Sequence, residues 1–191
     1  MRPPTGLGAI AILVAAAAVL AAIVHLVLIL LTPLVATRDA YARLATLGRA
    51  NETVALPPGG PGGGAPPYSD PAVAMAFCRY DLASGPIRVR APIGRAFSSI
   101  SFHTRRGLAF YALTDRAGAH GAIEAVLATP DDVRALAARD DEESPSRDLR
   151  IAAPDREGYV VIRVFSETPS LYSDAVANAK RLNCAPEPVP R

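Results

Sequence analysis

The sequence predicts an α+β protein with one N-terminal transmembrane helix and one mainly antiparallel, sandwich-like β domain that carries a few short helices. Three observations support this prediction. Residues 6–31 contain no Asp, Glu, Lys or Arg, and His25 is their one titratable side chain. Beyond this run, apolar residues alternate with period two in several short segments separated by Gly, Pro and Ser turns. The helical patterns between those segments are short and isolated, which is typical of antiparallel α+β or sandwich domains.

Residues 1–33 form the predicted anchor. At about 1.5 Å per residue, the apolar run can cross the roughly 30 Å hydrocarbon core of a bilayer. A cleaved signal sequence usually has an apolar region of roughly 7–15 residues and small residues before its cleavage site. This run is longer, and the best cleavage candidate, residues 34–36, has a bulky residue where a small one is preferred. The sequence therefore favours an uncleaved single-pass anchor, with the lipid bilayer as its partner.

One face of this anchor is a candidate contact for another helix. At about 100° of rotation per residue, five small residues and one histidine fall within roughly one third of the helix circumference. They are Gly8, Ala11, Ala15, Ala18, Ala22 and His25. Small residues let helices approach closely in lipid, so this face predicts a membrane-protein partner or a homodimer. The abundance of Ala in this chain is an equally good explanation, with His25 bonding to headgroups or backbone.

The segments that follow the anchor connect it to the domain. Residues 34–50 are predicted to form a juxtamembrane helix, because Leu and Tyr residues recur at roughly helical spacing before Gly48. Packing beneath the domain is favoured over a position on the headgroups. Residues 51–69 are predicted to be a Pro/Gly-rich connection that contains a short strand at 53–56.

The β-rich domain is predicted to cover residues 70–185, followed by an extended tail at 186–191. Asp70 and Pro71 predict a helix start, and a short helix should continue through Met75. Alternation then predicts antiparallel strands over 77–82, 87–90, 97–103, 108–114, 122–128, 149–153 and 159–165. A helix capped at Thr129 should end near residue 138. A last helix, 170–182, places Leu171, Ala175, Val176, Ala179 and Leu182 on its sheet-facing side.

Charge and cysteine content bear on partners and compartment. All 18 acidic residues and 19 of the 20 basic residues follow the anchor, so the domain is near neutral and no nucleic-acid partner is expected. Cys78 and Cys184 lie near the two ends of the domain, and a disulfide between them would require an oxidising compartment. Two unrelated buried thiols are the alternative. Arg38, Arg43 and Arg49 after the span outnumber Arg2 before it, which taken alone leans against an exported domain. Long domains that follow a span are translocated largely regardless of nearby charge, so the positive-inside rule does not settle the orientation.

A distinctive set of stretches comprises residues 70–82, 85–87, 97–102 and 114–116, with the Leu-Thr-Pro end of the span, residues 39–44 and the late Cys184. These stretches resemble the bacterial domain-of-unknown-function family twelve fifty-four, in its short single-span, membrane-anchored members. The resemblance implies a mainly antiparallel β domain outside the inner membrane, and it implies no reaction. In the strand over 97–103, Ser98 and His103 depart from the aromatic and acidic residues expected there.

Candidate chemistry is sparse. Arg88 and Arg90 share one strand face that suits an anionic ligand or lipid headgroups, although alternation alone would place them in water. His103, Asp115 and His120 would have to converge to hold a metal or to act as an acid–base set, and they form no recognisable ligand motif. Ser99 or Ser101 beside His103 suggests a hydrolase, but no Gly-x-Ser-x-Gly or Ser-x-x-Lys motif accompanies them. No catalytic residue, metal or cofactor is predicted.

The anchor and the cysteines, together with what the resemblance implies, predict an envelope protein anchored in the bacterial inner membrane, with its C-terminal domain in the periplasm. Its expected role is that of a non-catalytic binding or accessory module. A lipid or small-ligand binding module is the alternative, and a hydrolase or metal-dependent enzyme is the third hypothesis.

Overall fold

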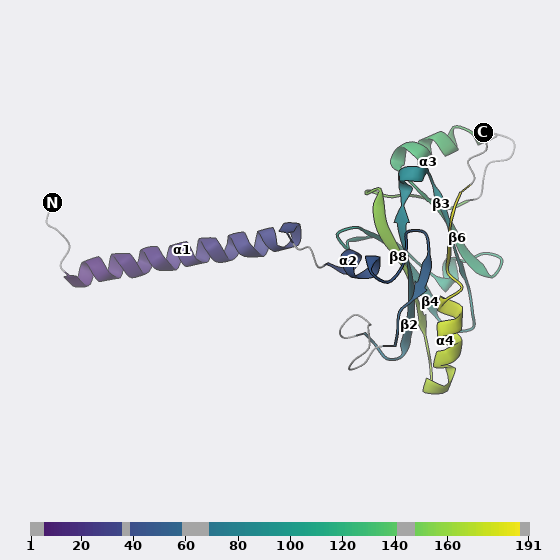
Figure 1. Ribbon diagram of the computed structural model, residues 1–191, viewed down its shortest axis with the longest axis horizontal. Coiled ribbons are helices and arrows are strands. Elements are labelled where there is room, and N and C mark those ends of the chain that lie inside the picture. The colour runs from purple at the N-terminus through teal and green to yellow at the C-terminus, as the bar shows by residue number, and fades with distance from the viewer. Residues whose placement is uncertain (1–5, 36–38, 59–68, 141–147, 188–191) are drawn as a thin grey trace. The chain divides into compact units, whose positions relative to one another are not determined.

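The computed structural model describes residues 6–35, 39–58, 69–140 and 148–187. The chain divides into two compact units, Met1–Asp39 and Ala40–Arg191. In the first unit, the helix α1 (Gly6–Val35) is continuous (Figure 1). Its stretch Gly6–Thr32 is long and apolar enough to span a membrane, which is compatible with single-pass anchoring.

The second unit contains two β-sheets. The five-stranded sheet has the order β1 (Thr53–Ala55), β2 (Val73–Asp81), β8 (Glu157–Phe165), β4 (Ser98–Thr104) and β5 (Ala109–Thr114). The four-stranded sheet has the order β7 (Arg150–Ala152), β6 (Ala122–Ala128), β3 (Ile87–Pro92) and β9 (Asn183–Pro186). Neighbouring strands pair antiparallel except β6 and β7, which pair parallel.

Three short α-helices accompany these sheets: α2 (Ala40–Ala45), α3 (Pro130–Ala137) and α4 (Tyr172–Ala179). Figure 1 shows α3 and α4 at opposite ends of the domain. The predicted cap of α3 is present, because Thr129 Oγ1 accepts a hydrogen bond from the Asp132 amide at 3.2 Å. Single 3₁₀ turns lie at Leu82–Ser84, Asp115–Ala117 and Pro169–Leu171. The α+β, mainly antiparallel prediction is confirmed.

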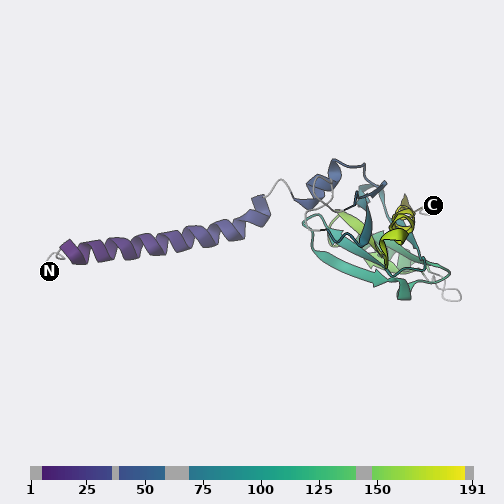
Figure 2. The same ribbon diagram turned by 90° about the horizontal axis from the view of Figure 1, so that it is seen from below.

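The main core lies between the two sheets. Alternate residues of β2, from Ala74 to Tyr80, face this core together with apolar residues of β3, β4, β6 and β8. The buried face of α4 completes it by packing against β2 and β8; α4 is the yellow helix in Figure 2. This arrangement is a sandwich in which α4 covers part of the inner face of the larger sheet.

A disulfide joins the two sheets across this core. It links Cys78 in β2 with Cys184 in β9, whose Cα atoms are 6.5 Å apart. Both residues are buried, at 0% and 4% exposed. The predicted disulfide is therefore present, and it links β9, the last strand of the domain, to β2 in the larger sheet.

The outer face of the larger sheet is partly covered by α2. Leu44 of α2 packs with Leu56, Phe77, Tyr159 and Val161 in a second apolar cluster. The Arg79 guanidinium lies over the Tyr41 ring, 5.4 Å from its centroid, and donates to the Gly48 carbonyl at 3.0 Å. The helix α2 covers only Ala40–Ala45, so it is much shorter than the juxtamembrane helix predicted for residues 34–50. As predicted, it packs against the domain.

The predicted helix at 70–75 is wrong. Asp70 instead closes a turn, in which its side chain accepts from the Ala72 amide at 2.8 Å and its carbonyl accepts from the Val73 amide. β2 then begins at Val73, and the period-two burial of its residues continues through the segment assigned to the helix. Local capping chemistry therefore misled the prediction, because the same side chain serves a turn before a strand.

The C-terminal predictions need two corrections. The last helix is shorter than 170–182, and Leu171, expected on the sheet-facing side, is 45% exposed. Residues 183–186 form a strand, β9, against β3, so Pro186 does not belong to an extended tail. Residues 188–191 of that tail, and residues 59–68 of the predicted Pro/Gly-rich connection, lie outside the described residues.

Candidate functional site

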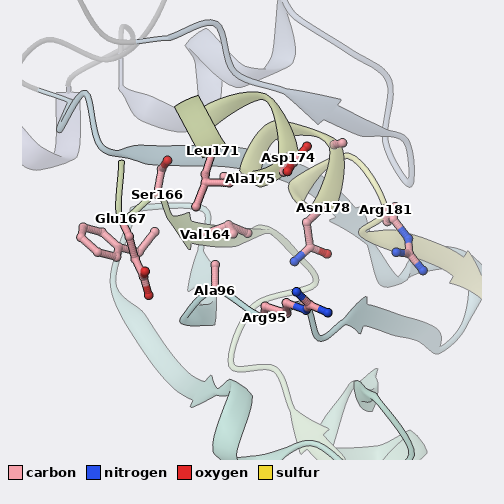
Figure 3. Close-up of a pocket in the computed structure, with 13 residues that line it drawn as sticks. Arg95, Ala96, Val164, Ser166, Glu167, Leu171, Asp174, Ala175, Asn178 and Arg181 are labelled. Atoms are coloured by element: carbon pink, nitrogen blue, oxygen red, sulfur yellow. The ribbon is translucent and has the colours of Figure 1, made fainter. Parts of the chain in front are cut away.

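The main candidate site is a pocket of about 540 Å³ lined by α4 (Figure 3). Three segments form its walls: the connection at 94–96 between β3 and β4, the end of β8 with the two residues after it, and one face of α4 with the following turn. Gly94 allows these walls to approach, because a Cβ at that position would lie 2.6 Å from Asn178 Nδ2. Residues far apart in the sequence therefore build one concave site.

Apolar residues form a substantial part of the lining. Val164 and Ala175 are buried, whereas Phe165 and Leu171 remain partly exposed. Pockets of roughly 300–1,000 Å³ that combine an apolar wall with a few polar groups are typical of small-molecule sites. The size and composition of this pocket therefore suit a small organic ligand.

The polar groups of the pocket come largely from α4 and its C-terminal turn. Asp174, Asn178 and Arg181 are spaced at i, i+4 and i+7, which places them on one side of the helix. Figure 3 shows Arg95 and Asn178 pointing toward one another, with Arg181 beyond Asn178. Glu167 lies at the other end of the pocket.

These polar groups have few partners within the chain. Among the described residues, Arg95, Arg181, Asp174 and Glu167 make no ion pair. The Asn178 Oδ1 atom is buried and has no hydrogen-bond partner in the described part of the chain. A buried acceptor without a donor is costly, so an external donor would satisfy it.

This pocket is not among the predicted sites. The helical pattern predicts the apolar face of the last helix, whereas the polar face formed by Asp174, Asn178 and Arg181 has no predicted role. The i, i+4, i+7 spacing was the available signal. The opposite wall could not be inferred, because only the tertiary packing places Gly94 and Arg95 across from α4.

Ser101 and His103, the residues of the hydrolase hypothesis, do meet on the outer face of the larger sheet. Ser101 Oγ lies 2.9 Å from His103 Nε2 and accepts a hydrogen bond from Arg163 Nη1 at 2.8 Å. His103 Nδ1 lies 3.3 Å from the Gly107 carbonyl oxygen, which can only accept, so Nδ1 carries the proton and Nε2 accepts from Ser101. The imidazole stacks on Tyr159 with centroids 4.8 Å apart.

Ser101 and His103 are hydrogen-bonded to each other and to neighbouring residues of the sheet, so they form a structural network. Burial lowers the pKa of His103, the Arg163 charge lowers it further, and the hydrogen bond to Gly107 opposes both. Ser101 is 8% exposed, and neither it nor His103 lines the pocket at α4. Ser99, the other candidate nucleophile, lies on the same face of β4 and is partly buried. The network links β4 to β8 and lies apart from the pocket at α4.

The proposed metal or acid–base set does not assemble. His103 pairs with Ala109 and Ser99 pairs with Thr114, so His103 and Asp115 lie at opposite ends of the β4–β5 hairpin. His120 follows in an exposed turn with a φ of 52°. Over the described ranges, no three His, Cys, Asp or Glu side chains are grouped to hold a metal ion.

Arg88 and Arg90, the candidate anionic-ligand face, already have carboxylate partners. Arg88 pairs with Glu187 at 2.7 Å and with Asp148 at 2.8 Å, and these bonds raise its pKa. Arg90 pairs with Glu124. An anionic ligand would have to displace these carboxylates, so this face is less suitable than the pocket at α4.

The predicted helix-contact residues, from Gly8 to His25, all lie on α1. Because the helix continues without interruption through these positions, the stripe of small residues stays on one side of it. Its role in helix association stays a prediction.

Two solved structures are similar to this chain. The VPA0106 protein from Vibrio parahaemolyticus matches with a TM-score of 0.53 and 13% identity, over 79% of this chain and 36% of that protein. An uncharacterized protein from Burkholderia cenocepacia matches with a TM-score of 0.45 and 13% identity, over 82% of this chain and 46% of that protein. The first likeness shows a shared fold, and this chain spans about one third of that protein's length.

Sequence comparison identifies the family. No curated protein matches the chain. Residues 67–186 match the family model described as "Protein of unknown function (DUF1254)", which covers more than half of the chain and includes all strands from β2 to β9. The chain therefore belongs to the DUF1254 family.

Proposed function

We propose that this protein is a single-pass, membrane-anchored binding module of the bacterial envelope, with its domain in the periplasm and a small-molecule site in the pocket at α4. The observation that carries the proposal is the pocket itself. Its volume, apolar wall and unpaired polar groups match the usual features of a ligand site. The proposal assigns the binding function to the domain and the anchoring function to α1.

The proposed compartment is supported by α1 and the disulfide. An apolar helix of this length suits an inner-membrane span, and a buried disulfide persists in an oxidising compartment such as the periplasm. The family resemblance to short, single-span bacterial members points to the same location.

The pocket lining favours recognition over catalysis. It includes no histidine or cysteine, and its serine, Ser166, is buried and donates to the Thr168 carbonyl at 2.7 Å. A nucleophile needs a neighbouring base or a lowered pKa, and the lining residues supply neither arrangement. Arginine, carboxylate and amide groups instead provide directional contacts to a charged ligand.

Native mass spectrometry of the full-length protein, released from gently solubilised membranes, tests the binding function. We expect a small molecule to remain bound to the wild-type protein and to Ser173→Trp. It should be lost from Ala177→Trp, because Ala177 lines the pocket and Ser173, exposed on the same helix, does not. An empty wild-type protein, or an Ala177→Trp variant that keeps the molecule, would contradict the proposal.

A C-terminal alkaline phosphatase fusion tests the compartment, because that enzyme needs export to become active. The full-length fusion should be active in cells, and a matched fusion that begins at Ala40 and lacks α1 should be inactive. An inactive full-length fusion, produced at normal levels, would place the domain in the cytoplasm and overturn the assigned location.

A further inference from the structure

We propose that the pocket at α4 takes a small zwitterion, a molecule that carries an ammonium and a carboxylate on a short apolar body. This inference rests on the proposed function, because it names the ligand class of that same pocket. It follows from three features of the lining: balanced charge, an unsatisfied buried acceptor, and the order of the polar groups along α4.

The charges of the lining are balanced and unpaired. Arg95 and Arg181 contribute two positive charges, and Glu167 and Asp174 contribute two negative charges. Within the described residues, none of the four is paired with another or with a side chain outside the pocket. A purely anionic ligand would meet two carboxylates, and a purely cationic ligand would meet two guanidinium groups. A ligand that carries both charges has a partner for each.

The ammonium subsite is formed by Asp174 and Asn178. These residues lie one helical turn apart on α4, so their side chains are neighbours on the helix surface. Asn178 Oδ1 is buried without a donor, and an ammonium supplies three donors with no acceptor. One ammonium between the two side chains would pair with the Asp174 carboxylate and, once the Asn178 amide turns toward the pocket, would donate to this oxygen.

The carboxylate subsite is formed by Arg95 and Arg181. A guanidinium presents a planar fork of donors that matches a carboxylate in a bidentate arrangement. Arg95 points toward Asn178 from the opposite wall, and Arg181 lies beyond Asn178 (Figure 3). The two subsites therefore adjoin at Asn178, as the short spacing of charges in a zwitterion requires, and the apolar wall around Val164 and Leu171 accommodates the body.

Titration calorimetry of the full-length protein in detergent tests this ligand class. Three probes share a phenyl body: L-phenylalanine carries both charges, 3-phenylpropanoate lacks the ammonium, and phenethylamine lacks the carboxylate. We expect L-phenylalanine to bind at least about tenfold more tightly than either analogue, the effect of one charge-assisted hydrogen-bonded group. Equal affinity for all three, or no binding of any, would overturn the zwitterion assignment.

Charge-neutralising variants assign the subsites. Asp174→Asn should weaken L-phenylalanine about tenfold and leave 3-phenylpropanoate unchanged, whereas Arg95→Gln should weaken both carboxylates and leave phenethylamine unchanged. Asp155→Asn and Arg116→Gln are matched controls at exposed positions outside the pocket, and they should change nothing. Equal loss of all three probes in Asp174→Asn would indicate a structural effect and would refute the assigned subsite.

The zwitterion assignment and the binding function of the pocket can be refuted separately. If no probe binds but the wild-type protein retains a co-purified molecule that Ala177→Trp loses, only the zwitterion assignment is overturned. If neither the probes nor a co-purified molecule occupy the wild-type protein, the binding function of the pocket is overturned as well.

Discussion

Reduction of the Cys78–Cys184 disulfide should destabilise the domain strongly. The bridge joins residues separated by 106 positions and connects the two sheets of the sandwich. In the chain-entropy account, closing a loop of about one hundred residues contributes about 4–5 kcal/mol to the free energy of unfolding. With a urea dependence of about 2 kcal/mol per molar, reduction should lower the unfolding midpoint by about 2 M.

Tyrosine fluorescence during urea unfolding, with and without reductant, measures this effect. The chain has no Trp, and its six Tyr residues all follow Asp39, so the signal reports on the domain and excludes α1. Comparing the oxidised and reduced wild-type protein leaves every side chain in place, which separates the loss of the bridge from any cavity effect. Alkylation in urea followed by mass spectrometry confirms the redox state of each sample. Equal midpoints would refute the stabilising role of the bridge.

Three further changes have expected outcomes. Tyr80→Phe removes a buried hydroxyl that donates to the His103 carbonyl at 3.1 Å, so the free energy of unfolding should fall by about 1 kcal/mol in the same urea assay. Because burial lowers the pKa of His103 below 6.5, the unfolded chain binds the proton first; stability should decline as the pH falls below about 6.5, and His103→Gln should weaken this decline. A pH profile identical in the variant would contradict that assignment. Ala15→Leu should weaken any self-association measured by energy transfer between labelled copies in detergent, whereas Ala17→Leu, outside the stripe, should not; equal effects would remove the stripe as a contact face.

The parts of the fold that depend on local pattern were predictable. Uninterrupted apolar composition identified α1, and period-two alternation identified β2 to β8, because one face of each strand meets a core. The Thr129 cap also identified the start of α3. The turn at Asp70 was not predicted, because a hydrogen-bond acceptor followed by Pro can begin either a helix or a turn before a strand.

Features that depend on contacts distant in sequence could not be predicted. β9 is a four-residue strand that ends in Pro, so its pairing with β3 and its disulfide to β2 decide its conformation more than its own pattern does. The parallel pairing of β6 and β7 across α3 likewise depends on tertiary packing. The pocket combines three such segments, and only Cys78 and Cys184 gave a long-range signal that the sequence alone could interpret.

Amide hydrogen exchange of the full-length protein tests the central claim, that the domain binds a small molecule at α4, most directly. Exchange should be compared between protein purified from gently solubilised membranes and the same protein after dialysis that removes bound small molecules. Because a ligand suppresses local opening around its site, the account predicts faster exchange after dialysis in α4 and in residues 94–96, with little change in β5. Unchanged exchange in α4, or a change confined to the sheet face around Ser101 and His103, would contradict it.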